Sequence, residues 1–428
     1  MKKLFAYLFI LIILGFGGYY VYINYLIDHI PKIDIEEEKV VVNEYYLYGN
    51  HFNLKGKLEI DNLDYEDIYL ILYNGEEKKY DINVDKKDGS IDISTSNYIN
   101  DGMYIDNLDR GIYYLFLKIS YKNDDDEDEP IIKYYALSND TEYDELIYYT
   151  LSKYNNSILI SSDDDYETFT FLVEENDEKN IYDVTIDPGH GGKDSGAISG
   201  SYKESDLSMD ISLKLKKYLE DNDIKVKLTH DKNDLSSNKK LDEYNEHGRA
   251  VIPNEVKSKY TFSIHLNKNE SSSVKGIEVY TPNSINYEFA KNIVNNIVES
   301  TDFGYSTNRM YKVYDGIYTH NFTEKEIASS LSGYEKKGYN PYKISTNSNY
   351  LYMIRETGGY LTGAYVDDSN PVEVGVNPYY HCNWGNESYL LELGYLSNTN
   401  DLSIILKSED LLAETIGKAI VNELSIES

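Results

Sequence analysis

Two hydrophobic patterns divide the chain. Between residues 41 and 178, short runs rich in β-branched and aromatic residues, such as 68–73 and 112–117, predict β-strands. Asn-Gly and Asp-Gly pairs between these runs are typical hairpin turns. Short strands at this spacing predict an all-β, sandwich-like domain over residues 41–178.

From residue 181 the pattern alternates between strands and amphipathic helices. Leu207, Ile211, Leu215 and Leu219 recur at four-residue steps and predict one apolar helix face. Strands are expected at 184–187, 224–228, 260–264 and 277–280, and helices at 287–298 and 401–424. Alternation of this kind predicts an α/β domain over residues 181–428, with helices covering a mainly parallel sheet.

The N-terminus has a third pattern, an uncharged stretch from residue 4 to 27 that follows Lys2 and Lys3. About 20 apolar residues span a bilayer as a helix, and flanking lysines favour a cytoplasmic N-terminus. We therefore expect a single-pass transmembrane anchor over residues 1–28, a charged linker over 29–40, and an extracytoplasmic remainder. A cleaved signal peptide is the alternative, although no small-residue cleavage site follows the apolar core.

Composition narrows the range of partners. The 428 residues carry a formal net charge of −33, which makes nucleic acid a poor partner because phosphate would be repelled. Cys382 is the single cysteine, so no intrachain disulfide can form. The 46 tyrosines fit either sugar stacking or the base composition of the genome.

Candidate chemistry gathers where predicted strands end. The strand at 184–187 runs into Asp187-Pro188-Gly189-His190-Gly191-Gly192, which leaves a histidine at the strand tip. Glu204 precedes the first amphipathic helix, and His265 closes the strand at 260–264. Open α/β sheets bind ligands at the carboxyl ends of their strands. Two histidines and one glutamate form the ligand set of a catalytic zinc site with one open position.

These stretches resemble the zinc-dependent N-acetylmuramoyl-L-alanine amidases of the Amidase_3 family, over roughly residues 181–427. The shared motifs are the D-P-G-H-G-G loop, a downstream glutamate, and S-I-H-x-N at 263–267. Arg249 and Asn254 match an R-x-x-x-x-N spacing, and 392–398 match a late E-x-G-[FY]-x-S-N. The chain departs from the family's T-R-D, which reads Thr229-His230-Asp231 here.

The resemblance implies Zn²⁺ as cofactor, held by His190, Glu204 and His265. It also implies Glu392 as the catalytic proton shuttle, and Arg249, Asn267 and Arg355 as residues that contact substrate or support the ligands. A buried ion pair between Glu392 and Arg355 is the alternative explanation for a carboxylate in an apolar strand. The other histidines, His29, His51, His230, His247 and His320, lack metal spacing and are expected at the surface or in turns.

The resemblance further implies hydrolysis of the amide between N-acetylmuramic acid and L-alanine in peptidoglycan, in cell-wall remodelling or daughter-cell separation. A zinc peptidase acting on stem peptides and a non-catalytic wall-binding scaffold are the alternatives. The β domain offers a surface for a protein activator or a wall partner. Residues 301–385 exceed what the domain needs, and we expect the Gly- and Asn-rich insertion 357–385 to lie beside the zinc cleft.

Overall fold

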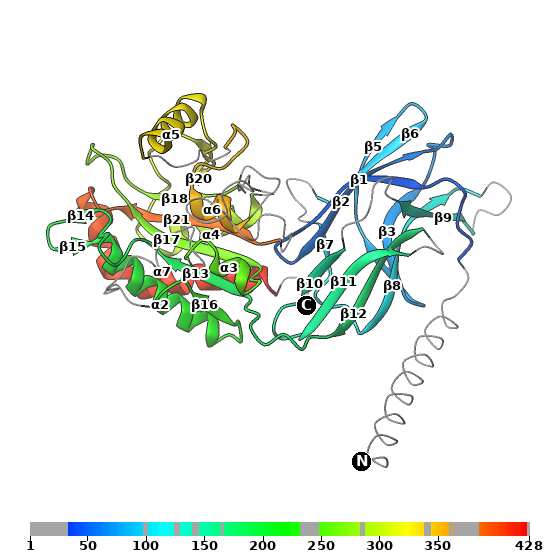
Figure 1. The fold of residues 1–428 in the computed structure, drawn as a ribbon, viewed down its shortest axis with the longest axis horizontal. Coiled ribbons are helices and arrows are strands. Elements are labelled where there is room, and N and C mark those ends of the chain that lie inside the picture. Colours follow the sequence, from blue (N-terminus) through cyan, green and yellow to red (C-terminus); the bar gives the residue numbers. More distant parts are fainter. Residues whose placement is uncertain are drawn as a thin grey trace, which may run out of the picture.

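The structure is a computed structural model that describes residues 33–96, 102–123, 129–138, 145–163, 167–231, 248–282, 287–337, 344–358, 362 and 385–425. Within these ranges the chain forms a β domain and an α/β domain that lie side by side (Figure 1). We call the latter the catalytic domain because it contains the candidate catalytic residues. The predicted anchor, 1–28, lies outside the described residues. No helix in the described part of the chain is long and apolar enough to cross a membrane.

The β domain is built from twelve strands. They are β1 (Val40–Tyr48), β2 (His51–Glu59), β3 (Asp67–Tyr73), β4 (Glu77–Tyr80), β5 (Asn83–Lys87), β6 (Ser90–Ser94), β7 (Met103–Tyr104), β8 (Gly111–Tyr121), β9 (Ile131–Ser138), β10 (Leu146–Tyr149), β11 (Asn156–Asp163) and β12 (Thr168–Glu175). Their order is β10-β11-β12-β8-β9-β1-β2-β6-β5, with β3 beside β8 and β4, and β7 beside β2.

These strands form two layers that share one apolar core. Strand β9 joins the layers because it pairs antiparallel with β8 and parallel with β1. Across the core, the ring of Phe52 on β2 lies 5.2 Å from that of Phe171 and 6.0 Å from that of Phe169, both on β12. Alternating inward side chains thus produce the sandwich-like arrangement that the short strands predict. The predicted linker is not free from residue 33 onward, since Ile35 pairs with Tyr134 of β9.

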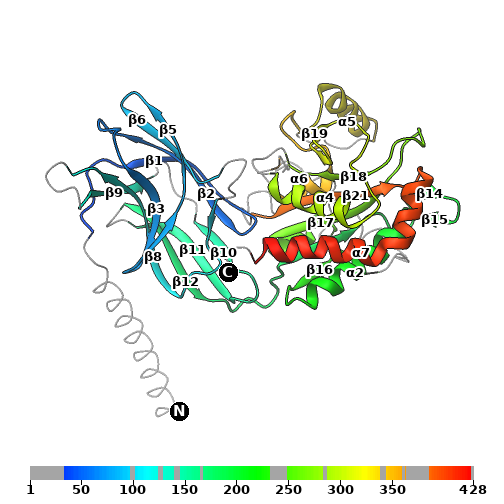
Figure 2. The same cartoon turned by 180° about the vertical axis from the view of Figure 1, so that it is seen from behind.

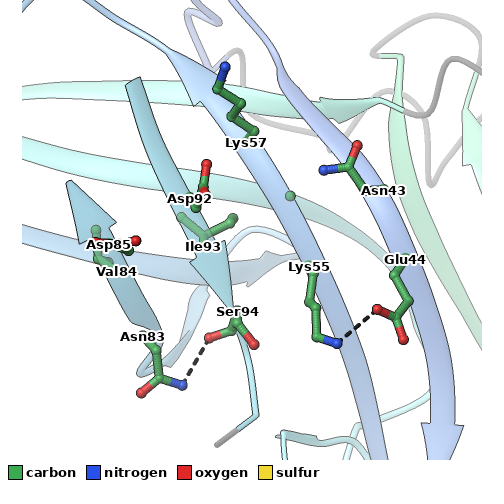
Figure 3. Close-up of a pocket in the computed structure, with 11 residues that line it drawn as sticks. Asn43, Glu44, Lys55, Lys57, Asn83, Val84, Asp85, Asp92, Ile93 and Ser94 are labelled. Atoms are coloured by element: carbon green, nitrogen blue, oxygen red, sulfur yellow. Dashed lines mark hydrogen bonds and ion pairs between the residues drawn. The ribbon is translucent and has the colours of Figure 1, made fainter. Parts of the chain in front are cut away.

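A groove of about 580 Å³ crosses the layer of β1, β2, β5 and β6 (Figure 3). It lies beside an irregularity in β1 at Asn43 and is lined by Lys55, Asp85 and Asp92 among others. Its charges are largely matched within the groove or next to it, as by the 2.8 Å pair between Lys55 and Glu44. None of the predicted catalytic residues lies there.

The catalytic domain contains a seven-stranded sheet of order β16-β13-β17-β21-β18-β20-β19, and a separate hairpin, β14-β15. The strands are β13 (Val184–Pro188), β14 (Ile198–Ser199), β15 (Tyr202–Lys203), β16 (Val226–Leu228), β17 (Tyr260–Asn267), β18 (Ile277–Tyr280), β19 (Lys312–Tyr314), β20 (Ile317–Tyr318) and β21 (Glu387–Tyr395). The helices are α2 (Glu204–Glu220), α3 (Ile252–Glu255), α4 (Glu288–Ser300), α5 (Glu324–Lys337), α6 (Tyr352–Thr357) and α7 (Thr399–Glu423).

Strands β16, β13, β17 and β21 are parallel, which confirms the prediction of a mainly parallel sheet. Their carboxyl ends meet at one edge, which we call the carboxyl edge, and their amino ends meet at the opposite, amino edge. The β14-β15 hairpin lies beyond the carboxyl edge, whereas the β domain lies against the amino edge (Figures 1 and 2). The common direction of these four strands therefore gives the sheet two distinct ends, with the β14-β15 hairpin at one and the β domain at the other.

Helices α2, α4 and α7 form where the apolar periodicity predicts them, whereas α3, α5 and α6 were not predicted. The stripe of Leu207, Ile211, Leu215 and Leu219 on α2 is buried in the sheet's apolar core. Helix α4 contributes Phe289, whose ring meets those of Phe262 and Tyr389 edge to face. Helix α7 packs against both α2 and α4, and the three helices together cover the sheet (Figure 2).

The described ends of the insertion 357–385 lie away from the carboxyl edge. Thr357 hydrogen-bonds to Ser388, near the start of β21, and the carbonyl oxygen of Gly385 accepts a hydrogen bond from the amide of Gly49 in the β domain, 2.6 Å away. The expectation that the end of this insertion approaches the zinc site is therefore wrong. Strand β21 begins at the amino edge and only later reaches Glu392. Most of the insertion lies outside the described residues.

Candidate metal centre

The structure brings His190, Glu204 and His265 together at the carboxyl edge. Glu204 Oε1 lies 3.0 Å from His190 Nε2 and 2.9 Å from His265 Nδ1. One potential ligand atom from each residue lies within 4.8 Å of the other two. Two imidazole nitrogens and one carboxylate oxygen match the donor set of a catalytic zinc site.

Local structure explains how each side chain reaches the centre. After β13 the chain turns sharply, and His190 takes the left-handed region with φ of 61°. Such backbone is uncommon for a residue with a side chain and is often found at functional sites. His265 is near the end of β17, where the pairing with β21 shifts register between His265 and Asn267. Glu204 is the first residue of α2, and its carboxylate accepts hydrogen bonds from the amides of Ala197 (2.8 Å) and Leu266 (3.1 Å).

Asp194 supports the centre and was not predicted from the sequence. Its Oδ2 lies 2.8 Å from His190 Nδ1, the ring nitrogen that faces away from Glu204. A carboxylate in this position fixes the orientation of a metal-binding histidine. The available signal was its place four residues after His190, at the end of the glycine-rich loop.

The charges of the centre favour a bound cation. Burial lowers the pKa of His190, but the carboxylates of Glu204 and Asp194 outweigh burial and raise this pKa to about 9. Burial raises the pKa of Glu204, but hydrogen bonds from His190 and His265 hold that pKa well below its usual range. His190 therefore holds a proton that a bound metal ion would displace.

Glu392 lies beside the centre without a partner. Its backbone is in register with His265 on β17 and with Glu278 on β18. Its carboxyl makes no hydrogen bond or ion pair with the described residues, and Oε2 is buried. Burial, followed by the charges of Glu204 and Glu278, raises the pKa of Glu392 well above its usual value. A carboxyl whose pKa is raised in this way is suited to acid–base chemistry.

The alternative ion pair with Arg355 is wrong. The Arg355 guanidinium lies in an ion pair with Glu356, with Nε 3.0 Å from Oε1, and donates to the carbonyl of Asn349 at 2.8 Å. Arg355 thus holds the turn before α6. An ion pair at Glu392 would need a cation beside its carboxyl, and Arg355 does not supply one.

Glu278 is a second buried carboxylate that the sequence did not single out. It accepts hydrogen bonds from Ser306 Oγ (2.7 Å), Tyr280 Oη (3.0 Å), Asn267 Nδ2 (3.1 Å) and Tyr395 Oη. These donors suit an ionised carboxylate, which only accepts. Asn267 also accepts from the amide of Lys268 at 2.7 Å, so it braces the end of β17.

Arg249 holds the loop that carries His190. Its Nη2 donates to the carbonyls of Pro188 (2.9 Å) and His190 (2.8 Å), and its Nε lies 3.1 Å from Asp187 Oδ1. Asn254, five residues later, donates to the carbonyl of Glu356 at 3.3 Å. Arg249 therefore holds the loop of His190, whereas Asn254 holds helix α6.

Three of the remaining histidines are buried, contrary to the prediction. His51, His230 and His320 are only 6–8% exposed. His230 Nδ1 lies 3.4 Å from Arg249 Nη2. Burial lowers the pKa of His230 to about 4, so a neutral imidazole occupies the position of the arginine in the T-R-D motif. His320 is stacked between Tyr311 and Tyr350. His29 and His247 lie outside the described residues.

A His–Glu–His group with a carboxyl of raised pKa beside it, at the carboxyl edge of an α/β sheet, defines the candidate centre of a metal-dependent hydrolase. Residues 184–358 match the model of the Amidase_3 family, described as N-acetylmuramoyl-L-alanine amidase. The matched segment contains His190, Glu204 and His265 but ends before Glu392, short of the expected limit at residue 427.

The chain is 28% identical over 145 residues to the germination-specific N-acetylmuramoyl-L-alanine amidase of Bacillus subtilis (strain 168), over 32% of this chain and 59% of that protein. It is 36% identical over 98 residues to the endolysin of Bacillus phage SPP1, over 23% of this chain and 32% of the endolysin. The chain thus spans less than two thirds of either relative.

Among solved structures, the catalytic domain of CwlV, an N-acetylmuramoyl-L-alanine amidase from Bacillus (Paenibacillus) polymyxa var. colistinus, gives a TM-score of 0.36 at 22% identity. The likeness covers 57% of this chain and 99% of that one. The amidase AmiC2 of Nostoc punctiforme gives a TM-score of 0.35 at 22% identity, over 58% and 99% of the two chains.

Proposed function

We propose that this chain is a zinc-dependent N-acetylmuramoyl-L-alanine amidase that hydrolyses the amide between N-acetylmuramic acid and L-alanine in peptidoglycan. One observation carries the proposal. The three candidate metal-binding side chains meet beside Glu392, whose carboxyl has no partner among the described residues and a raised pKa, and all three belong to the segment that matches the amidase family.

His190, Glu204 and His265 would hold the metal. Their nitrogen and oxygen donors fit zinc, and three protein ligands leave one position open for chemistry. Zinc bound there would act as a Lewis acid towards the scissile carbonyl and would make a neutral-pH nucleophile of water. Asp194 keeps His190 in the orientation and tautomer that binding needs, and Arg249 fixes the loop that carries it.

Glu392 supplies the proton transfers. Amide hydrolysis needs a base that takes a proton from the attacking water and an acid that gives one to the leaving amine. A single carboxyl can do both in turn, provided that its pKa is raised towards the working pH. Glu392 meets this condition because Oε2 of its half-buried side chain is shielded from water and the charges of Glu204 and Glu278 act on it.

We also propose that residues 1–28 anchor the protein in the cell membrane, with the catalytic domain outside. The lysine-flanked apolar segment supports this, and peptidoglycan lies on that side of the membrane. Fractionation of cells should recover the chain with membranes. Recovery of a soluble mature form that begins beyond residue 30 would contradict the anchor.

Incubation of the purified chain with peptidoglycan sacculi tests the activity. An amidase releases stem peptides with a free amino terminus on L-alanine and leaves intact glycan strands. A stem-peptide peptidase would instead release peptide fragments, and a wall-binding scaffold would release nothing. Measured zinc content, and loss and return of activity on chelation and zinc addition, would test the cofactor.

A further inference from the structure

The amino edge of the catalytic sheet is closed by two turns of the β domain. The turn between β1 and β2 places Gly49 and Asn50 against the start of β17 and β21. The amide of Gly49 donates to the carbonyl of Gly385 at 2.6 Å, and Tyr260 Oη donates to Asn50 Oδ1 at 3.1 Å. Asn50 and Tyr260 are each 1% exposed, so these contacts are fully shielded from water.

The turn between β10 and β11 enters the catalytic core itself. Leu151 belongs to the same apolar cluster as Val184 and Val226 of the catalytic sheet. Next to it, Ser152 donates from its backbone N (2.6 Å) and its Oγ (2.5 Å) to the carboxylate of Asp183. The core of the catalytic domain is therefore incomplete without a residue from the β domain.

Buried charges also bridge the two domains. Lys259, immediately before β17, is 1% exposed, and its ammonium lies 4.8 Å from the centre of the Tyr148 ring in the β domain. Burial lowers the pKa of Lys259, while Asp106 of the β domain and Asp183 of the catalytic domain oppose that shift. Buried charges are strongly destabilising when one partner is removed, so separation of the domains is opposed.

The β1-β2 turn approaches the catalytic domain so closely that a side chain at Gly49 would require Tyr260 and Glu387 to shift. Gly49 has φ of 58°, and a Cβ atom there would come within 2.8 Å of Tyr260 Oη and 2.9 Å of Glu387 Oε2. Domains joined by a linker are expected to move relative to each other unless their interface is large and apolar. A shared apolar core, shielded hydrogen bonds and this close backbone approach are features of a permanent contact.

We propose that the β domain is a permanent structural partner of the catalytic domain, which completes its core through the β1-β2 and β10-β11 turns. The two domains fold and unfold as one unit. The β domain then acts as a rigid support that holds the carboxyl edge at the far end of the molecule, and not as a mobile wall-binding module. This inference does not depend on the proposed amidase activity, because it concerns the opposite edge of the sheet.

Two matched glycine substitutions in the full chain test the proposal. Gly49→Ala and Gly89→Ala both place a side chain at positive φ in a turn of the β domain, at 58° and 72°. Only at Gly49 would the added methyl group meet the catalytic domain, since nothing lies within 4 Å of the Cβ position at Gly89. The comparison thus cancels the backbone strain and isolates the contact between domains.

Hydrogen exchange followed by mass spectrometry, together with calorimetry, gives the readout. The unmodified chain should unfold in a single calorimetric transition. Gly49→Ala should speed amide exchange at the amino ends of β13 and β17 by about tenfold or more, whereas Gly89→Ala should change exchange only around β5 and β6. Two separate transitions, or unchanged exchange in β13 and β17, would overturn the proposal.

Tyr260→Phe keeps the test decisive if Gly49→Ala fails to fold. It removes only the hydroxyl that donates to Asn50, and should speed exchange at the β1-β2 turn and at the start of β17 together, by a few-fold. Faster exchange on one side of the interface alone would mean that the domains open independently, which contradicts the proposal.

Discussion

Glu392 at the carboxyl edge and Asp183 at the amino edge of the catalytic sheet differ in how their carboxyl groups are paired. Glu392 lies near Glu204 and Glu278, its Oε2 is shielded from water, and it has no partner among the described residues. At the amino edge, the carboxylate of Asp183 accepts hydrogen bonds from Ser152 and from the amide of Lys225. Unpaired buried groups retain reactivity at a cost in stability, whereas satisfied ones hold a structure together.

Strand β17 connects the two edges. Lys259 directly precedes β17, and His265 lies near its other end, within an element of eight residues. Because a strand is extended and is fixed by neighbours on both sides, the support at one edge also fixes the metal centre at the other. If this comparison is correct, changes at the carboxyl edge should alter chemistry and changes at the amino edge should alter stability.

The largest effect is expected from Glu392→Gln, which keeps the size of the side chain and removes its titrating carboxyl. Turnover should fall by about 10²–10⁴-fold while the zinc content stays unchanged, because in the proposed mechanism Glu392 transfers protons and does not bind the metal. Steady-state kinetics and metal analysis measure both quantities.

His265→Ala is the matched contrast, since it should lose zinc and turnover together. Loss of zinc in Glu392→Gln would make Glu392 a ligand and close the open position. Full turnover in Glu392→Gln would place the base elsewhere.

Acid should affect His230 at the carboxyl edge and Asp106 at the amino edge in opposite directions. Burial lowers the pKa of His230 to about 4, so between pH 6.5 and 4 the unfolded chain binds a proton that the folded chain does not. The contribution of His230 to stability is therefore lost as the pH falls through this window, by up to about 3 kcal/mol. Urea unfolding of the unmodified chain and of His230→Asn at several pH values should show their stability difference shrinking towards pH 4.

Asp106 at the amino edge provides the opposite sign. Burial raises the pKa of Asp106 to about 6, so between pH 3.8 and 6 the folded chain binds a proton that the unfolded chain does not. Stability from this group is lost as the pH rises through 6 and regained on acidification. The difference between the unmodified chain and Asp106→Asn should therefore grow towards low pH. Parallel trends for the two variants would refute the contrast between the edges.

Asp194→Asn should weaken zinc binding by about 10–100-fold, since the amide orients His190 less strongly than the carboxylate. Competition with a chelating dye measures the affinity. Asp221→Asn, an exposed change at the end of α2, serves as the control and should leave affinity unaltered. Equal affinity in Asp194→Asn and its control would remove Asp194 from the metal centre.

The smallest effect is expected from Ser152→Ala, which removes one of the hydrogen bonds to Asp183 and leaves the backbone donor in place. The free energy of unfolding should fall by about 1–2 kcal/mol, with zinc affinity unchanged. Urea unfolding and metal titration together measure this. A variant that loses zinc affinity at full stability would show that the amino edge acts directly on the metal centre.

The sequence by itself located the main strands and helices of the catalytic domain and the three candidate metal-binding residues. The apolar periodicity located α2, and the glycine-rich loop and the end of the 260–264 run placed His190 and His265 at strand ends. Such features are local, because a period of two or 3.6 residues and a strand followed by glycines can be seen within one short window. Parallel strands then bring their carboxyl ends to one edge, so the juxtaposition of these ligands followed from the fold class.

Only the tertiary structure decided the role of the remaining buried charges. Glu278 lies beside Glu392 because β18 pairs with β21. Arg355 forms an ion pair with Glu356 and not with Glu392. Lys259 looks like an ordinary surface lysine in the sequence, and its burial against Tyr148 and Asp106 depends on residues more than one hundred positions away. Whether a charge is paired, and by what, depends on the solvent that distant segments exclude, and no local pattern encodes that exclusion.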